Sequence, residues 1–148
     1  MSNKIPPPIV TLFFGLCIYL SRPYFPEFSS SLLNSLSVIS FVVGISIFVA
    51  AVSSFKKQKT TVNPISIEKA SSLVINGIFK YSRNPMYLGM SFILLGLVFK
   101  FNVIGGLLFT SMFMLFITIF QIKPEEAAME KLFDQEWKDY TKNVRRWL

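Results

Sequence analysis

The sequence predicts an all-α fold, a polytopic membrane helical bundle of about four transmembrane helices followed by a C-terminal amphipathic helix. Of the 148 residues, 52% are hydrophobic and 16% are aromatic, which is more apolar surface than one soluble core of this length can bury. The apolar residues gather in four runs, and helices are the form in which such runs cross lipid. We therefore expect residues 1–148 to form a single membrane domain.

The first pair of predicted spans covers about 8–20 and 32–55. The first is shorter than the roughly 20 residues that a full crossing needs, and we expect the aromatic stretch through Phe28 to complete it at the interface. No small-residue cleavage pattern follows it, which favours a membrane helix over a signal peptide. The second run contains no charged residue and is long enough to cross.

The second pair of predicted spans covers about 85–99 and 103–122. The break at 100–102, followed by Gly105 and Gly106, is typical of a tight turn. The two spans should therefore form an antiparallel helical hairpin. The third span has only about 14 residues, or roughly 21 Å of helix, so it must tilt or extend toward the preceding segment.

Loop charges predict the orientation of these spans. The loop at 56–84 carries one acid, Glu68, against six cations: Lys56, Lys57, Lys59, Lys69, Lys80 and Arg83. The positive-inside rule places this loop in the cytoplasm, and four spans then put both termini there. We expect the bacterial inner membrane. The net charge is +7, and the positive residues flank apolar runs. We therefore expect the lipid bilayer as a partner and no nucleic acid. The oligomeric state is not indicated.

A charged tail follows the last span and is predicted to form an amphipathic helix at 124–142. Apolar residues recur through it at helical spacing: Met129, Leu132, Phe133, Trp137, Tyr140, Val144 and Trp147. Such a helix should lie on the membrane surface or over the bundle. Histidine is absent and Cys17 is the only cysteine, so we expect no metal site, no disulfide and no Ser-His or Cys-His nucleophile.

Two polar clusters flank the predicted hairpin. One reads Tyr-Ser-Arg-Asn-Pro-Met-Tyr at 81–87, and the other is Glu125-Glu126 after the fourth span. Because the two spans run antiparallel, the clusters should meet at one membrane face. A cation, an amide, a phenol and two carboxylates would converge there beside apolar helices, which is typical of a small-molecule site.

Each part of these clusters also has a structural interpretation. Asn84 before Pro85 is typical of a helix start, and Pro124 with the two acids is typical of another. Arg83 can serve as a membrane-surface anchor, and the tyrosines of the first cluster as interfacial belt residues. The occurrence of both clusters at one face favours the functional interpretation.

Together these residues resemble a known family. The matching pattern is Ser-Arg-Asn-Pro-Met-Tyr-Leu-Gly at 82–89, a hydrophobic hairpin, Glu125-Glu126, and then Leu132, Phe133, Trp137, Tyr140 and Arg145-Arg146-Trp147. This pattern resembles the isoprenylcysteine carboxyl methyltransferases and the related phospholipid methyltransferases, whose signature reads Arg-His-Pro-x-Tyr, a hydrophobic stretch and Glu-Glu. The resemblance covers roughly 73–148, and the first two spans match only in character.

The resemblance implies a membrane-embedded methyltransferase that uses S-adenosylmethionine and acts on a lipophilic or amphiphilic acceptor. The positions matching the cofactor-binding motif are Arg83, Asn84, Tyr87, Glu125 and Glu126. Asn84 stands where the family usually has histidine; it can still form hydrogen bonds but cannot titrate. No catalytic base is identifiable.

Arg145 and Arg146 form a further candidate site. Their cationic side chains could bind an acidic acceptor, such as a carboxylate or a phosphate headgroup. A membrane-surface anchor for the tail is an equally good interpretation of this pair.

Two other functions stay open at this level. A sterol-reductase type of enzyme shares a similar membrane fold and uses NADPH, but its motif carries an acid where this chain has Met90 after Gly89. The other is a non-catalytic four-helix membrane protein or small transporter. Such a transporter needs an ionisable residue within a span to couple ions, and the first two spans contain none.

Overall fold

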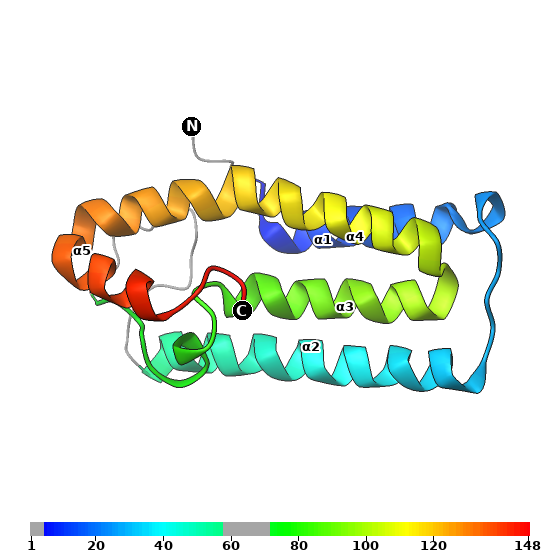
Figure 1. Cartoon of the computed structure of the whole chain (residues 1–148), viewed down its shortest axis with the longest axis horizontal. Coiled ribbons are helices and arrows are strands. Elements are labelled where there is room, and N and C mark those ends of the chain that lie inside the picture. The colour runs from blue at the N-terminus through cyan, green and yellow to red at the C-terminus, as the bar shows by residue number, and fades with distance from the viewer. Residues whose placement is uncertain (1–4, 58–71) are drawn as a thin grey trace.

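The computed structural model describes residues 5–57 and 72–148, and the all-α prediction is confirmed. The elements are α1 (Pro7–Leu20), η1 (Arg22–Tyr24), α2 (Ser31–Lys57), η3 (Gly77–Lys80), α3 (Pro85–Phe101), α4 (Val103–Ile117), η4 (Thr118–Ile122) and α5 (Lys123–Asn143). Four of them, α1 to α4, lie side by side along the long axis (Figure 1). Helix α3 packs against each of the other three, so it forms the centre of the bundle.

Small residues bring α2 and α3 into close contact. A Cβ atom on Gly44 of α2 would lie only 2.7 Å from the main-chain oxygen of Gly89 on α3. Farther along the pair, Ser37 Oγ donates a hydrogen bond of 2.8 Å to the main-chain oxygen of Gly96. Close backbone approach through small residues, with a polar side chain bonded across the interface, is how helices associate in lipid.

Large apolar side chains fill the space between α3, α1 and α4. Phe14 and Phe113 meet edge to face with ring centroids 5.8 Å apart, a favoured aromatic geometry. Ile18, Leu94 and Phe113 are all fully buried there. This core extends to Tyr87, Ile117 and Ile122, so it leads directly to the polar end of the bundle.

The predicted hairpin is present, but its turn is made differently from the prediction. Helices α3 and α4 are joined by the single residue Asn102. Its Oδ1 accepts the Gly105 N–H at 3.0 Å and caps α4, while its Nδ2 donates to Ser21 Oγ at 3.1 Å. Gly105 and Gly106 lie inside α4, where any Cβ would meet Phe25 or Val98 at less than 3 Å. The turn therefore falls within the predicted break at 100–102, while the two glycines expected to belong to it lie in α4 and permit close packing beside it.

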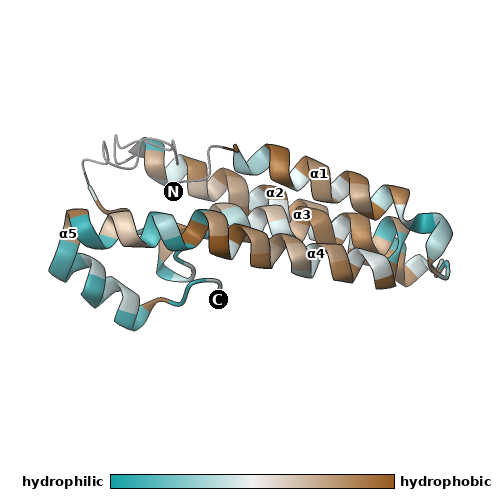
Figure 2. Cartoon of the chain, turned by 90° about the horizontal axis from the view of Figure 1, so that it is seen from above, coloured by the Kyte–Doolittle hydropathy of each residue, from teal (hydrophilic) through white to brown (hydrophobic). Residues whose placement is uncertain are grey.

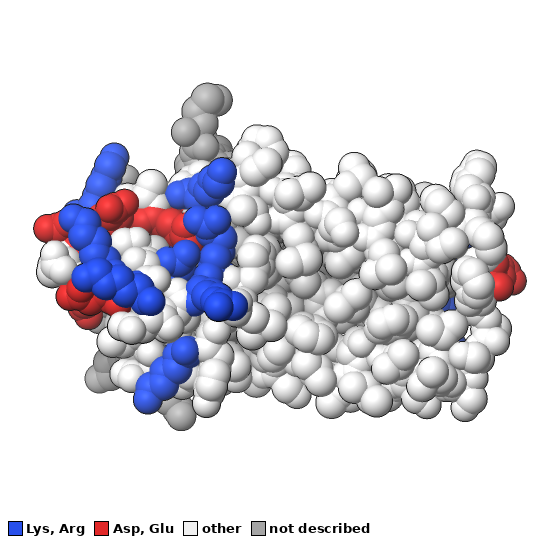
Figure 3. All heavy atoms as spheres, viewed as in Figure 1, with Lys and Arg blue, Asp and Glu red and all other residues white. Residues whose placement is uncertain are grey.

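The distribution of hydropathy suits a membrane protein. Among the residues that the structure describes, two helices are long and apolar enough to cross a membrane, namely α2 and the continuous helix from Val103 to Asn143. Helices α1 and α3 are apolar but have 14 and 17 residues, or about 21 and 25 Å at 1.5 Å per residue. The bundle is apolar along its length (Figure 2), and charged side chains gather at the end that carries α5 (Figure 3). The number of four crossings stays a prediction, and residues 58–71 of the proposed cytoplasmic loop lie outside the described part.

The C-terminal helix differs most from the sequence prediction. A five-residue π-helix, η4, continues α4 directly into α5. Helix α5 then breaks at Asp134, whose φ of 33° and ψ of −100° are not helical. The second half of α5 folds back toward the start of α3 (Figure 1), where Trp137, Tyr140 and Val144 pack with Leu73. The amphipathic tail predicted at 124–142 therefore consists of two short helices that cover the end of the bundle.

Candidate functional site

The two polar clusters that flank the hairpin meet at the α5 end of the bundle. Pro85 is the first residue of α3, and Glu125 and Glu126 lie in the first turn of α5. Because α3 and α4 run antiparallel, the start of α3 lies beside the start of α5. The predicted meeting of the two clusters is confirmed, because Tyr87 bonds Glu125 and Arg83 pairs with Glu126. Arg146, which the sequence suggested separately as a candidate for the acceptor, also joins them through contacts with Glu126 and Asn84.

Tyr87 and Glu125 form the inner pair of this site. The Tyr87 phenol donates a hydrogen bond of 2.5 Å to Glu125 Oε1. Tyr87 is only 6% exposed and belongs to the apolar core, so the carboxyl meets a poorly solvated environment. Burial raises the pKa of Glu125 from 4.5 to about 7, and the neighbouring charge of Glu126 raises it as well, while the Tyr87 hydrogen bond opposes the rise. Glu125 can therefore change its charge near neutral pH.

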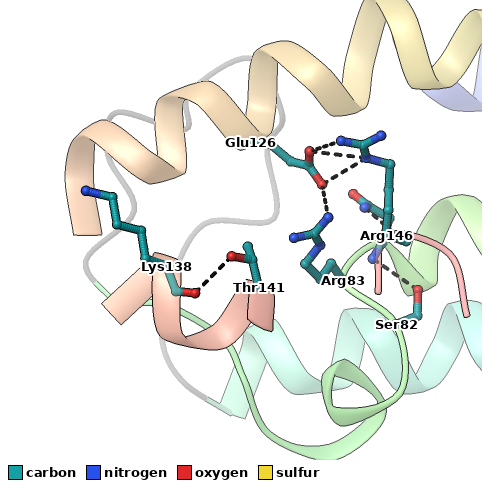
Figure 4. A network of polar contacts seen from close by, with 7 residues as sticks. Ser82, Arg83, Glu126, Lys138, Thr141 and Arg146 are labelled. Carbon is teal, nitrogen blue, oxygen red and sulfur yellow. Dashed lines mark hydrogen bonds and ion pairs between the residues drawn. The ribbon is translucent and has the colours of Figure 1, made fainter. Parts of the chain in front are cut away.

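Glu126 lies between two arginines and forms the outer part of the site (Figure 4). Arg83 Nη2 lies 3.1 Å from Glu126 Oε1. On the other side, Arg146 Nη2 lies 2.6 Å from Oε2, and Arg146 Nε reaches both oxygens at 3.2 Å. The side chains of Arg83 and Glu126 are only 13% and 15% exposed, so this contact is better shielded from water than an ordinary surface ion pair.

Asn84 has a role that its sequence context did not indicate. It occupies the N-cap position of α3, yet its side chain makes no capping hydrogen bond. Instead, Nδ2 donates a hydrogen bond of 3.0 Å to the main-chain oxygen of Arg146. The buried Ser82 Oγ accepts the Asn84 main-chain N–H at 3.1 Å. The interpretation of Asn84 and Pro85 as a helix start is therefore confirmed, with Asn84 at the N-cap, but the Asn84 side chain does not cap the helix.

The two adjacent arginines of the tail are not equivalent. Arg146 binds Glu126 through its guanidinium, whereas the Arg145 side chain is exposed. Arg145 contributes its main-chain oxygen, which accepts the Arg83 N–H at 3.0 Å. Of the two, Arg145 presents its charge outward and Arg146 belongs to the polar cluster.

Two aromatic residues support the site and were not among the predicted site residues. The Trp137 ring lies 5.7 Å from the Arg83 guanidinium carbon, a distance that permits cation–π attraction. Tyr140 Oη donates to the main-chain oxygen of Phe79 at 2.7 Å, which ties the second half of α5 to the segment before the motif. Phe133, Trp137 and Tyr140 are spaced four and three residues apart in the sequence, as on one face of a helix. Only the break at Asp134 brings that face onto Arg83.

The described residues contain no group of three or more histidine, cysteine, aspartate or glutamate side chains placed to hold a metal ion.

The structure thus defines a class of protein: an apolar helical bundle with a compact polar site where the bundle meets its charged end. The model of the phospholipid methyltransferase family matches residues 33–136. The chain belongs to this family and is an integral membrane methyltransferase for lipid-type substrates. No curated protein and no solved structure matches the chain.

Proposed function

We propose that this protein transfers a methyl group from S-adenosylmethionine to a lipophilic or amphiphilic acceptor in the membrane. The observation that carries the proposal is the joining of Tyr87–Glu125 to Arg83–Glu126–Arg146 at the end of the apolar bundle. A polar cluster at this level can bind a water-soluble cofactor while the acceptor's chains stay in lipid. Membership in a methyltransferase family favours this function over the reductase and transporter alternatives.

The residues of the site suit the cofactor's amino-acid end. Arg83 Nε is buried and has no hydrogen-bond partner among the described residues, so a donor is available for a carboxylate. Glu125 is a partly buried acid whose described hydrogen bond comes from a phenol, so its carboxylate can still accept from an ammonium group. With both acids ionised, two arginines and two carboxylates balance, and a zwitterionic group can bind without leaving net charge behind.

We assign the following roles within this proposal. Arg83 would hold the carboxylate of the cofactor, and Glu125, oriented by Tyr87, would hold its ammonium group. Glu126 would fix the two arginines in place through its bidentate contact with Arg146. When bound, S-adenosylmethionine supplies a methyl group on a positively charged sulfur. The chain's own contribution is to align this group with the acceptor and to exclude water through the apolar core that reaches Tyr87.

Arg145 is the better of the two tail arginines for the acceptor. Its side chain is exposed, while Arg146 is already engaged by Glu126. Arg145 would bind a phosphate or carboxylate of the acceptor at the membrane surface. We place this end of the bundle, with both termini, on the cytoplasmic side of a bacterial inner membrane, in keeping with the positive-inside rule.

Calorimetric titration of the detergent-purified protein with S-adenosylhomocysteine tests the cofactor site. We expect saturable binding that is weakened at least tenfold by Arg83→Ala and by Glu125→Ala, because each removes a charge-assisted contact. Arg22→Ala and Glu27→Ala are matched controls, since Arg22 begins η1 and Glu27 follows it, and both lie outside the polar cluster. Folded protein that binds no S-adenosylhomocysteine, or unchanged binding by both site variants, would contradict the proposal.

Methyl transfer itself can be measured with radiolabelled S-adenosylmethionine and vesicles of bacterial lipid. We expect label to enter the organic-soluble fraction with the wild-type protein and not with Glu125→Ala. Vesicles that contain only phosphatidylglycerol, which has no amine, would show whether an amine headgroup is the acceptor. Label in no lipid fraction at all would contradict a lipid acceptor.

A further inference from the structure

Residues 144–148, here called the C-terminal strap, cross the polar site. The strap follows α5 and begins at Val144, which is buried beside Trp137 and Tyr140. Near its end, Trp147 packs against the apolar core that contains Tyr87. Between these two anchors lie Arg145 and Arg146. The strap therefore spans from one hydrophobic cluster to another over the residues proposed to bind the cofactor.

Two consecutive carbonyl groups of the strap are bound by two consecutive residues of the motif. The Arg83 main-chain N–H donates to the Arg145 oxygen at 3.0 Å, and Asn84 Nδ2 donates to the Arg146 oxygen at 3.0 Å. A carbonyl oxygen only accepts, so the Asn84 amide must present its NH2 group to it. Of the two contacts, only the second depends on the identity of a side chain.

The Asn84 side chain is free for this task because other groups satisfy the start of α3. Ser82 Oγ takes the Asn84 main-chain N–H, and the Asn84 side chain does not cap the helix. The contact also fixes the main chain from which the Arg146 side chain reaches Glu126 at 2.6 Å. Asn84 thus controls the placement of a guanidinium that it does not itself touch.

We propose that Asn84 is a positioning residue: its amide NH2 holds the Arg146 carbonyl and thereby keeps the C-terminal strap, with Arg146 on Glu126, closed over the site. Histidine can do the same, because its Nδ1 lies the same number of bonds from Cα as Nδ2 of asparagine and donates when it carries the proton. The asparagine therefore preserves a hydrogen-bond donor, and titration is not required of this position. The inference deepens the proposed function, since it gives Asn84 a place in the cofactor site through the strap.

Limited trypsin digestion followed by intact-mass measurement shows how readily the strap detaches, and it needs no ligand. Cleavage after Arg145 or Arg146 requires the strap to detach, whereas Lys131, exposed on α5, provides an internal reference site away from the strap. We expect Asn84→Ala to speed strap cleavage about 3- to 10-fold relative to Lys131, the range for loss of one hydrogen bond. Asn84→Asp should do at least as much, because it places an acceptor against a carbonyl. Asn84→His should restore the slow rate.

The choice of variants separates loss of the strap from loss of the fold. Aspartate is a favourable residue at a helix N-cap, so Asn84→Asp is expected to fold even if Asn84→Ala does not. Asn143→Asp is the matched control: it adds the same charge to an asparagine of the same tail, whose Nδ2 bonds the Asp139 oxygen outside the strap. This control should leave the cleavage ratio unchanged.

Binding of S-adenosylhomocysteine then tests the link to the site. We expect the affinity to fall for Asn84→Ala and Asn84→Asp, by up to the factor seen in cleavage, and to recover in Asn84→His. Strap cleavage at the wild-type rate in folded Asn84→Ala and Asn84→Asp would overturn the proposal, as would faster cleavage with unchanged affinity. If the wild-type protein binds no S-adenosylhomocysteine, the proposed function fails, while cleavage alone still decides whether Asn84 holds the strap.

Discussion

Replacing Glu125 by glutamine should change how the stability of this protein depends on pH. Burial raises the pKa of Glu125 from 4.5 to about 7 in the folded protein. In that range the folded state holds a proton that the unfolded state has lost, so stability from this group falls as pH rises from about 4.5 to 7 and is constant above. At about 1.4 kcal/mol per pH unit, the full effect over this range is at most about 3.5 kcal/mol.

Unfolding by SDS in mixed micelles, measured from pH 4.5 to 8, provides the assay. Other groups titrate in both proteins, so the informative quantity is the difference in unfolding free energy between Glu125→Gln and wild type. We expect this difference to shift in favour of the glutamine variant by about 2 to 3 kcal/mol between pH 4.5 and 8. Glu130→Gln removes a carboxyl from an exposed position of the same helix and serves as the reference.

A difference curve for Glu125→Gln that is flat across this range would refute the reasoning. It would mean that the Glu125 carboxyl is well solvated or fully paired, and that the inner pair with Tyr87 is not the desolvated element described above. A curve of opposite sign would mean that the carboxylate is stabilised in the fold, as by a cation, and would argue that Glu125 rather than Glu126 is the arginine partner.

Three further predictions concern the same structure. Tyr87→Phe removes a hydrogen bond that lowers the pKa of Glu125. When the effect of Glu125→Gln on unfolding free energy is measured in the Tyr87→Phe background, its pH transition should therefore move above 7. A shift of this transition to lower pH would contradict the assignment. Gly44→Ala should lower the midpoint of thermal unfolding in detergent, because the new Cβ would lie 2.7 Å from the Gly89 oxygen and overpacking costs about 1–3 kcal/mol. An unchanged midpoint would show that α2 and α3 separate freely. Asn102→Ala loses a helix cap and a buried hydrogen bond, which should lower the free energy of unfolding by about 1–3 kcal/mol. The affinity for S-adenosylhomocysteine should stay unchanged, because the turn is at the opposite end of α3. A parallel loss of binding would contradict that separation.

The sequence alone was enough to predict the four apolar helices and the end of the bundle where the two polar clusters meet. Apolar runs without charges mark the segments that lie in lipid, and the break before Val103 marks the turn of the hairpin. An antiparallel hairpin necessarily returns to the face where it began. The meeting of Arg83 and Tyr87 with Glu125 and Glu126 followed from that geometry, without knowledge of any side-chain contact.

Only the tertiary structure decided what each polar residue does there. The break at Asp134 has no strong local signal, because neither glycine nor proline occupies it, and it is the packing of Trp137 and Tyr140 against Leu73 that accompanies the fold-back. This return brings Arg146 to Glu126 and its carbonyl to Asn84, contacts that join residues 20 and 62 positions apart. Hydropathy and helical spacing are local properties of the chain, whereas the partner of a side chain depends on how distant segments pack.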